Sequence, residues 1–152
     1  MKLGFIGTGV IASSVISGVC RSRISFQKII VSPRNRNVAQ KLRKRFRKVD
    51  IAKTNQEIVD KCNWVFLAVT PKVGEKILPK LNFRSNQKII SFISTINLPQ
   101  LKKIVKKKAK IVRAIPLPPI SLGKGPVPIY PPDRQIKSFF NKIGTTVEIR
   151  SE

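Results

Sequence analysis

The sequence predicts an α/β fold in which helices cover both faces of a mainly parallel sheet. Short apolar runs alternate with amphipathic segments, a glycine-rich turn follows the first apolar run, and residues 64–69 (WVFLAV) are apolar without interruption. A continuous apolar run is typical of a strand buried on both faces. Strands that alternate with helices form parallel sheets through right-handed crossovers. These observations together indicate a doubly wound domain.

Hydrophobic periodicity sets the expected order of elements. Strands are expected at residues 3–6, 28–32, 49–52, 64–69, 88–93, 110–115 and 146–149, and helices at 10–20, 36–47, 73–80, 98–107 and 134–143. Asn55 is expected to cap one further short helix. Residues 116–132 hold most of the eleven prolines, which exclude helix. Within them, 125–130 is expected to be an edge strand, where proline is tolerated.

The turn after the first strand carries the most specific signal. Gly7-Thr8-Gly9-Val10-Ile11-Ala12 lies between that strand and the first helical pattern. In this context GxGxxA predicts a Rossmann-type loop that binds a pyrophosphate on free N–H groups at a helix N-terminus. Gly7 allows the tight turn, Gly9 allows close approach of the phosphates, and Ala12 lets the helix lie near the strand. The alternative is an ordinary strand–helix turn.

The segment after the second strand predicts which dinucleotide binds. NAD-specific proteins place a carboxylate there for the ribose 2′-OH, but this chain has no Asp or Glu before Asp50. It has instead a polar run that includes Ser32, Arg34, Asn35 and Arg36. Hydroxyl and guanidinium donors suit a dianionic 2′-phosphate. We therefore expect NADP(H), the alternative being solvated turn residues in a basic protein.

Composition excludes several classes of protein. We expect 152 residues to form one domain, residues 1–150, and find no apolar run of about 18 residues that would span a membrane. Cys20 and Cys62 lack metal-ligand spacing, and with no secretory signal we expect buried thiols and a cytoplasmic location. The chain has no His, and we find no catalytic Ser-His-Asp set, metal cluster or close carboxylate pair.

The net charge of +24, from 31 Lys and Arg against seven Asp and Glu, is extreme. It concentrates in residues 41–48 (KLRKRFRK) and 102–110 (KKIVKKKAK). Apolar residues recur at helical spacing through both runs, so the charges are expected on the outer faces of two amphipathic helices. Aromatic residues for base stacking are few. We expect no specific nucleic-acid partner, the alternative being non-specific binding of polyanions.

Several segments, taken in order, resemble the pyrroline-5-carboxylate reductases of proline biosynthesis. They are MKLGFIGTG, VSPRN, TNQEIVDKCNWVFLAVTPK, ISFISTINLPQL, and RAIPLPP followed by Gly123 and Gly125. A subgroup with a GP-x-x-IYPPD segment is especially similar. The resemblance covers essentially the whole chain and implies NADPH-dependent reduction of a cyclic imine to proline. The family's C-terminal helical domain, which binds the substrate carboxylate and forms the homodimer, is expected to be absent after Glu152.

The resemblance also implies site residues. The pyrophosphate is expected at Ile6, Gly7, Thr8, Gly9, Val10 and Ile11, the 2′-phosphate at Ser32, Arg34 and Asn35, the adenosine near Asn55, and the nicotinamide beside Ala68, Val69, Thr70, Pro71, Ile93, Ser94 and Thr95. These segments follow predicted strands, where open α/β sheets bind ligands. No catalytic residue is assigned, because the cofactor carries the reactive atom. Tyr130 is either a proton donor or an edge-strand residue with a solvated hydroxyl.

Two positions depart from the family pattern. Thr70 stands where the family has Lys, and Leu117 stands where it has Asn, so Leu117 cannot provide an amide contact. Two classes of function therefore stay open. One is the cofactor-binding part of a pyrroline-5-carboxylate reductase, which meets its imine substrate only if a substrate domain is supplied. The other is a non-catalytic NADP(H)-binding module.

Overall fold

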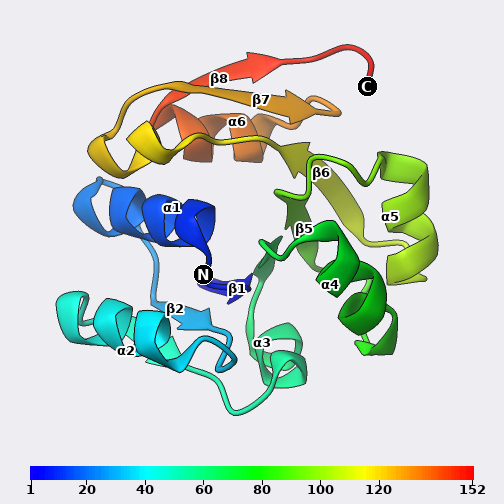
Figure 1. The fold of residues 1–152 in the computed structure, drawn as a ribbon. Coiled ribbons are helices and arrows are strands. Elements are labelled where there is room, and N and C mark those ends of the chain that lie inside the picture. The colour runs from blue at the N-terminus through cyan, green and yellow to red at the C-terminus, as the bar shows by residue number, and fades with distance from the viewer.

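The computed structural model describes residues 1–152 and contains one eight-stranded sheet flanked by six α-helices (Figure 1). The strands are β1 (Lys2–Ile6), β2 (Lys28–Val31), β3 (Val49–Ile51), β4 (Trp64–Leu67), β5 (Lys88–Ser91), β6 (Lys110–Ala114), β7 (Pro126–Tyr130) and β8 (Thr145–Glu148). The helices are α1 (Val10–Arg21), α2 (Arg36–Arg45), α3 (Asn55–Lys61), α4 (Pro71–Ile77), α5 (Leu98–Val105) and α6 (Arg134–Asn141), with 3₁₀ turns η1 (Leu78–Lys80) and η2 (Pro118–Leu122). No helix combines the length and the apolar character needed to cross a bilayer.

The strand order is β3-β2-β1-β4-β5-β6-β7-β8. The first six strands in this order are parallel, β7 runs antiparallel to β6, and β8 is parallel to β7. The chain therefore winds outward from β1 in one direction and from β4 in the other. The order reverses between β1 and β4, which is where doubly wound sheets bind ligands. The expected fold class is confirmed.

Two apolar cores, one on each face, hold the layers together. The larger contains 24 buried residues and packs α1, α2 and α6 on one face, and the other contains 16 and packs α3, α4 and α5 on the opposite face. Alternate strand residues serve opposite cores: Phe66 belongs to the larger core and Val65 to the smaller one. Phe5 and Phe66 stack at the centre of the larger core with ring centroids 4.4 Å apart.

The charged runs and the thiols lie much as expected. Leu42, Leu101 and Val105 are buried, while the Lys and Arg residues around them are exposed. Cys62 is buried and Cys20 is half-buried, and neither forms a disulfide. Burial raises the pKa of both thiols to about 11, so both stay protonated at neutral pH.

The proline-rich strand is not at the edge of the sheet. β7 lies between β6 and β8, and β8 forms the edge, so the expectation of an edge strand at 125–130 is wrong. The carbonyl of Pro128 accepts the N–H of Ile115, so its ring nitrogen also faces β6, which pairs with β7 at only two positions. Toward β8, the carbonyls of Gly125 and Ile129 accept hydrogen bonds. The ring nitrogens of the prolines, which cannot donate a hydrogen bond, therefore face β6, where β7 forms few hydrogen bonds.

The cap of α3 also differs from the expectation by one residue. Thr54, not Asn55, is the N-cap, and its hydroxyl accepts the N–H of Glu57 at 3.2 Å. Both residue types are good caps, so the sequence alone does not choose between them. The side chain of Asn55 is consequently available for a contact outside its own helix.

Candidate functional site

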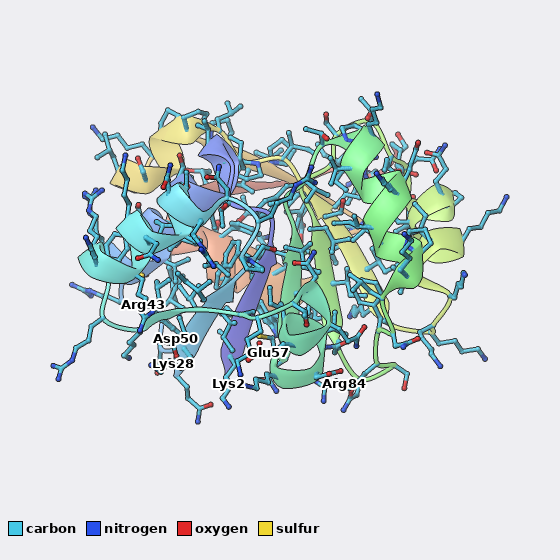
Figure 2. The ribbon with its side chains drawn as sticks, turned by 60° about the horizontal axis from the view of Figure 1, so that its bottom comes forward. Lys2, Lys28, Arg43, Asp50, Glu57 and Arg84 are labelled. Carbon is cyan, nitrogen blue, oxygen red and sulfur yellow. The ribbon has the colours of Figure 1, made fainter.

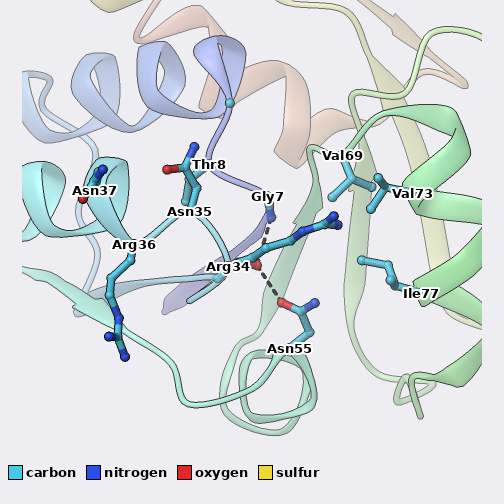
Figure 3. Close-up of a pocket in the computed structure, with 12 residues that line it drawn as sticks. Gly7, Thr8, Arg34, Asn35, Arg36, Asn37, Asn55, Val69, Val73 and Ile77 are labelled. Carbon is cyan, nitrogen blue, oxygen red and sulfur yellow. Dashed lines mark hydrogen bonds between the residues drawn. The ribbon is translucent and has the colours of Figure 1, made fainter.

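A cavity of about 540 Å³ opens at the carboxyl ends of β1, β2 and β4, beside the point where the strand order reverses (Figure 3). Residues of the β1–α1 loop, the β2–α2 loop, the first turn of α3, and the β4–α4 region form its walls. They are Gly7, Thr8, Gly9, Ser32, Arg34, Asn35, Arg36, Asn37, Asn55, Val69, Val73 and Ile77. The topology thus brings four distant segments to one crevice.

Two glycines shape the β1–α1 loop in different ways. Gly7 has φ +104°, and a Cβ placed there would lie 2.3 Å from the carbonyl oxygen of Ala68. Gly7 is therefore required by the fold itself. A Cβ on Gly9 would meet nothing within 4 Å, so the fold does not require glycine there. Its absence of a side chain instead leaves the backbone at the start of α1 accessible from the cavity.

The N-terminus of α1 is open to an anion. Its N-cap, Gly9, provides no side-chain hydrogen bond, and the first turn holds no acidic residue. The first-turn N–H groups of a helix lack intrahelical partners and carry partial positive charge. In addition, the hydroxyl of Thr8 is buried without any hydrogen-bond partner, although buried polar atoms are nearly always paired. A diphosphate supplies the oxygens that these groups lack, so they fit the phosphates of a dinucleotide.

Ser32 connects the walls of the cavity. Its hydroxyl accepts the N–H of Gly7 at 2.9 Å and donates to Oδ1 of Asn55 at 2.6 Å. Ser32 is only 3 % exposed. The hydroxyl is thus already used inside the protein, and its expected contact with a 2′-phosphate stays a prediction.

The basic residues after β2 take different directions. The side chain of Arg34 extends across the cavity toward Val69 and Val73, whereas that of Arg36 points away (Figure 3). Neither is in an ion pair. Oδ1 of Asn35 accepts the N–H of Val38 at 3.5 Å as the N-cap of α2. Arg34 is therefore the free cation that faces the cavity.

The residues expected on the nicotinamide side lie after β4 and β5, at the same edge of the sheet. Of these, Val69 lines the cavity. The hydroxyl of Thr70 accepts the N–H of Val73 at 3.4 Å as the N-cap of α4, and the carbonyl of Ser94 accepts Nη2 of Arg113 at 2.6 Å. The expected residues outside the cavity lining are Ile6, Val10, Ile11, Ala68, Thr70, Pro71, Ile93, Ser94 and Thr95.

Three lining residues were not expected at a site. Asn37 follows the basic turn, and Val73 and Ile77 lie four residues apart on α4. The spacing of Val73 and Ile77 predicts a core-facing stripe, and in the structure that stripe turns partly to the cavity. Hydrophobic periodicity identifies the inward face of a helix but does not distinguish a core from a cavity wall.

Comparison with known proteins agrees with this geometry. Residues 2–97 match the family described as NADP oxidoreductase, coenzyme F420-dependent. The pyrroline-5-carboxylate reductase of Synechocystis sp. is 28 % identical over 98 % of this chain and 58 % of its own length. That of Escherichia coli K12 is 27 % identical over 86 % and 49 %. The chain thus spans about half the length of the curated relatives it matches.

Solved structures show the same fold. The 1-pyrroline-5-carboxylate reductase of Streptococcus pyogenes superposes with a TM-score of 0.83 at 24 % identity, over 98 % of this chain and 58 % of its own. The Plasmodium falciparum pyrroline carboxylate reductase, solved with NADP bound, gives 0.83 at 23 % identity over 98 % and 57 %.

The family description names NADP, in agreement with the cofactor expected from the turn after β2. The curated relatives confirm the resemblance to pyrroline-5-carboxylate reductases that the sequence motifs indicated. The chain therefore belongs to the family of NADP oxidoreductases described as coenzyme F420-dependent, and it corresponds to the NADP-binding N-terminal domain of pyrroline-5-carboxylate reductases.

Proposed function

We propose that this chain binds NADP(H) as the cofactor domain of a pyrroline-5-carboxylate reductase, which reduces a cyclic imine to proline. The observation that carries the proposal is the convergence of anion-binding groups on one cavity. The open N-terminus of α1, the unpaired Thr8 hydroxyl and the free guanidinium of Arg34 all meet there. No carboxylate lines this cavity, which favours a ligand with several phosphates.

Each wall of the cavity has a distinct task in this proposal. The first-turn amides of α1 and the Thr8 hydroxyl hold the pyrophosphate. The guanidinium of Arg34 pairs with the 2′-phosphate, because a planar guanidinium binds phosphate oxygens in a bidentate manner. Val69, Val73 and Ile77 form an apolar wall that excludes water. Bound NADPH supplies the hydride, so the chain needs to bind and orient it and provides no nucleophile of its own.

The substrate side of the reaction is a further part of the proposal. Thr70 already uses its hydroxyl as a helix cap, and Leu117 is apolar and 48 % exposed. Leu117 therefore offers a substrate no donor, and Thr70, whose hydroxyl accepts the N–H of Val73, offers a single O–H instead of the ammonium of the Lys that the family has there. We therefore propose that the imine is bound together with a second, substrate-binding domain or a partner, in a homodimer as in the family the chain resembles. The cytoplasm is the proposed compartment, because both cysteines are free thiols.

These same two positions favour a second candidate, an NADP(H)-binding module without turnover. The two candidates share the cofactor site and differ in catalysis. Calorimetry with NADPH tests the site, and the consumption of NADPH in the presence of pyrroline-5-carboxylate tests the reaction. Binding with turnover supports the reductase, and binding without turnover supports the module. Failure to bind NADPH at all would overturn both.

Thr8→Val provides a sharp variant for the binding test. The exchange removes a hydroxyl that is buried and unpaired, so the free energy of unfolding should stay the same or increase. NADPH affinity should nevertheless fall several-fold, because the pyrophosphate loses a donor. Thr145→Val, at an exposed position on β8, is the matched control and should change neither quantity. A Thr8→Val protein with undiminished NADPH affinity would contradict the assigned role of Thr8.

A further inference from the structure

We propose that the outer surface of α2 binds the phosphate backbone of double-stranded nucleic acid without sequence preference. The surface, called here the α2 cationic face, consists of Arg36, Lys41, Arg43, Lys44 and Arg45 of the helix and of Arg47 in the turn that follows it. All six residues are exposed. Figure 2 shows α2 at the margin of the molecule, with side chains that project from it into solvent. NADP(H) binding does not account for this concentration of charge.

The cations of this face have no counter-charge within the protein. Residues 36–47 contain no Asp or Glu, and none of the six cations is in an ion pair. The carboxylate of Asp50, which follows closely in the sequence, pairs with Lys28 at 3.0 Å (Figure 2). Like charges spaced three or four residues apart destabilise a helix, so a polyanion on this surface relieves a repulsion that the fold leaves uncompensated.

Helix stability accounts for only part of this charge. Cations in the last turn of a helix interact favourably with its dipole, and Arg43, Lys44 and Arg45 occupy the last turn of α2. Arg36 is the first helical residue, where the dipole disfavours a cation. Lys41 lies in the middle, where the dipole has little effect. The helix dipole therefore does not account for the basic character of these two residues.

A shallow groove runs along the same face. It measures about 380 Å³ and is lined by Arg36, Asn37, Gln40, Lys41 and Lys44, with no apolar residue among them. Guanidinium, amide and ammonium donors line it, which suits phosphate oxygens. A ten-residue helix is about 15 Å long, enough to follow several phosphates of one strand.

The chemistry of the face favours duplex nucleic acid over other polyanions. A helix that lies on a membrane presents apolar side chains to the lipid, but the apolar residues Ala39 and Leu42 of α2 are buried in the larger core. Proteins that hold single strands stack bases on aromatic side chains, and the nearby Phe46 packs against the same core. The side chains that remain exposed are cations and the amides of Asn37 and Gln40, and a cationic surface of this kind favours sequence-independent contact with the backbone.

The groove is contiguous with the NADP(H) cavity. Arg36 and Asn37 line both, and the side chain of Arg36 points away from the cavity (Figure 3). The two sites therefore draw on shared residues, and NADPH should lower the affinity for a duplex at α2. This competition rests on the proposed function, whereas binding of the duplex does not.

Fluorescence anisotropy of a short labelled DNA duplex with the full chain tests the proposal. The double variant Lys41→Glu/Lys44→Glu should weaken binding by roughly tenfold or more and reduce the salt slope by about two. The matched control is Lys102→Glu/Lys103→Glu, which changes the net charge equally on the exposed surface of α5 and should weaken binding far less. Circular dichroism verifies that both variants fold.

The measured affinities either support the proposal or overturn it. Equal weakening by both double variants would mean attraction by net charge alone. Tighter binding of an unstructured single strand would assign the face to single strands, and binding of anionic phospholipid vesicles without duplex binding would assign it to a membrane. Equal affinity for duplexes of unrelated sequence would support backbone contact. If NADPH binds but leaves duplex affinity unchanged, the competition fails while the α2 site stands.

Discussion

The amide of Gly7 donates a 2.9 Å hydrogen bond to the hydroxyl of Ser32, and this bond joins the β1–α1 loop to the end of β2. The same hydroxyl donates to Asn55 at 2.6 Å, so the first turn of α3 is fixed to the same point. Three walls of the cavity thus depend on one buried hydroxyl. The cofactor site is organised as much by this side chain as by the glycines beside it.

Ser32→Ala tests that relationship. Removing the hydroxyl leaves the partly buried amide of Gly7 without its acceptor, which should lower the free energy of unfolding by about 1–3 kcal/mol. NADPH affinity should also fall, because the glycine loop loses its anchor. Denaturant unfolding and calorimetry measure the two effects. Ser85→Ala, at an exposed position, should alter neither, and an unchanged stability of Ser32→Ala would contradict the anchoring role.

Gly9→Ala and Gly7→Ala should separate function from folding. A Cβ at Gly9 enters open space, so Gly9→Ala should change stability by about 0.5 kcal/mol or less while it weakens NADPH binding tenfold or more. A Cβ at Gly7 collides with the carbonyl of Ala68 and should destabilise the fold itself. Thermal unfolding measured beside calorimetry checks both. Retained NADPH affinity in Gly9→Ala would show that the phosphates do not approach the backbone there.

Asp133 should control stability at acidic pH. Burial would raise its pKa, but hydrogen bonds from the N–H of Ile136 and from Lys110 and Lys88 outweigh burial and hold the pKa below its ordinary value. Its stabilising contribution is therefore complete above the unfolded carboxyl pKa of about 3.9. That contribution is lost as the pH falls through the lower folded value.

Asp133→Asn should reduce the fall in the free energy of unfolding at acidic pH. At neutral pH it should cost about 3 kcal/mol, because Lys88 is 9 % exposed and loses its 3.1 Å partner. Unfolding by urea across the acidic range provides the measurement. The control Asp60→Asn changes an exposed carboxylate outside any ion pair and should leave the profile intact. If Asp133→Asn loses stability at acidic pH as steeply as the natural chain, the loss must come from other groups.

The two thiols should react slowly in the folded protein. Burial raises the pKa of Cys20 and Cys62 to about 11 from 9.0, which reduces the thiolate fraction at neutral pH by about a hundredfold. Reaction with a thiol-specific disulfide reagent should accelerate strongly when the chain is unfolded by guanidinium. Equal rates in the folded and unfolded protein would contradict the burial of Cys62 and the partial burial of Cys20.

Local signals predicted the fold and the glycine-rich turn after β1 well. The apolar run at 64–69 predicted β4, which in the structure ends at Leu67, and the glycine spacing predicted the turn that leads into α1. Both signals are properties of adjacent residues. The position of β7 inside the sheet depends on pairing with β8, which the sequence of β7 does not encode. The choice of Thr54 over Asn55 as a cap depends on the competing contact with Ser32.

The cavity was predictable in location but less so in its lining. Strand ends at a reversal of the sheet indicate where ligands bind, and Gly7, Thr8, Gly9 and Arg34 all lie there. The roles of Val73 and Ile77 were not predictable, since a cavity wall and a core share one periodicity. The hydroxyl of Ser32 is already hydrogen-bonded to the amide of Gly7, which lies 25 residues away in the sequence. A contact between such distant segments could not be predicted from local sequence.

The dissociation constants of NADPH and NADH, measured for the natural chain, for Arg34→Gln and for the charge-matched control Arg47→Gln, test the central claim most directly. We expect the natural chain and Arg47→Gln to bind NADPH at least tenfold more tightly than NADH. Arg34→Gln should lose that preference while its affinity for NADH stays the same. Tighter binding of NADH by the natural chain, or an Arg34→Gln protein that keeps the full preference for NADPH, would contradict the account.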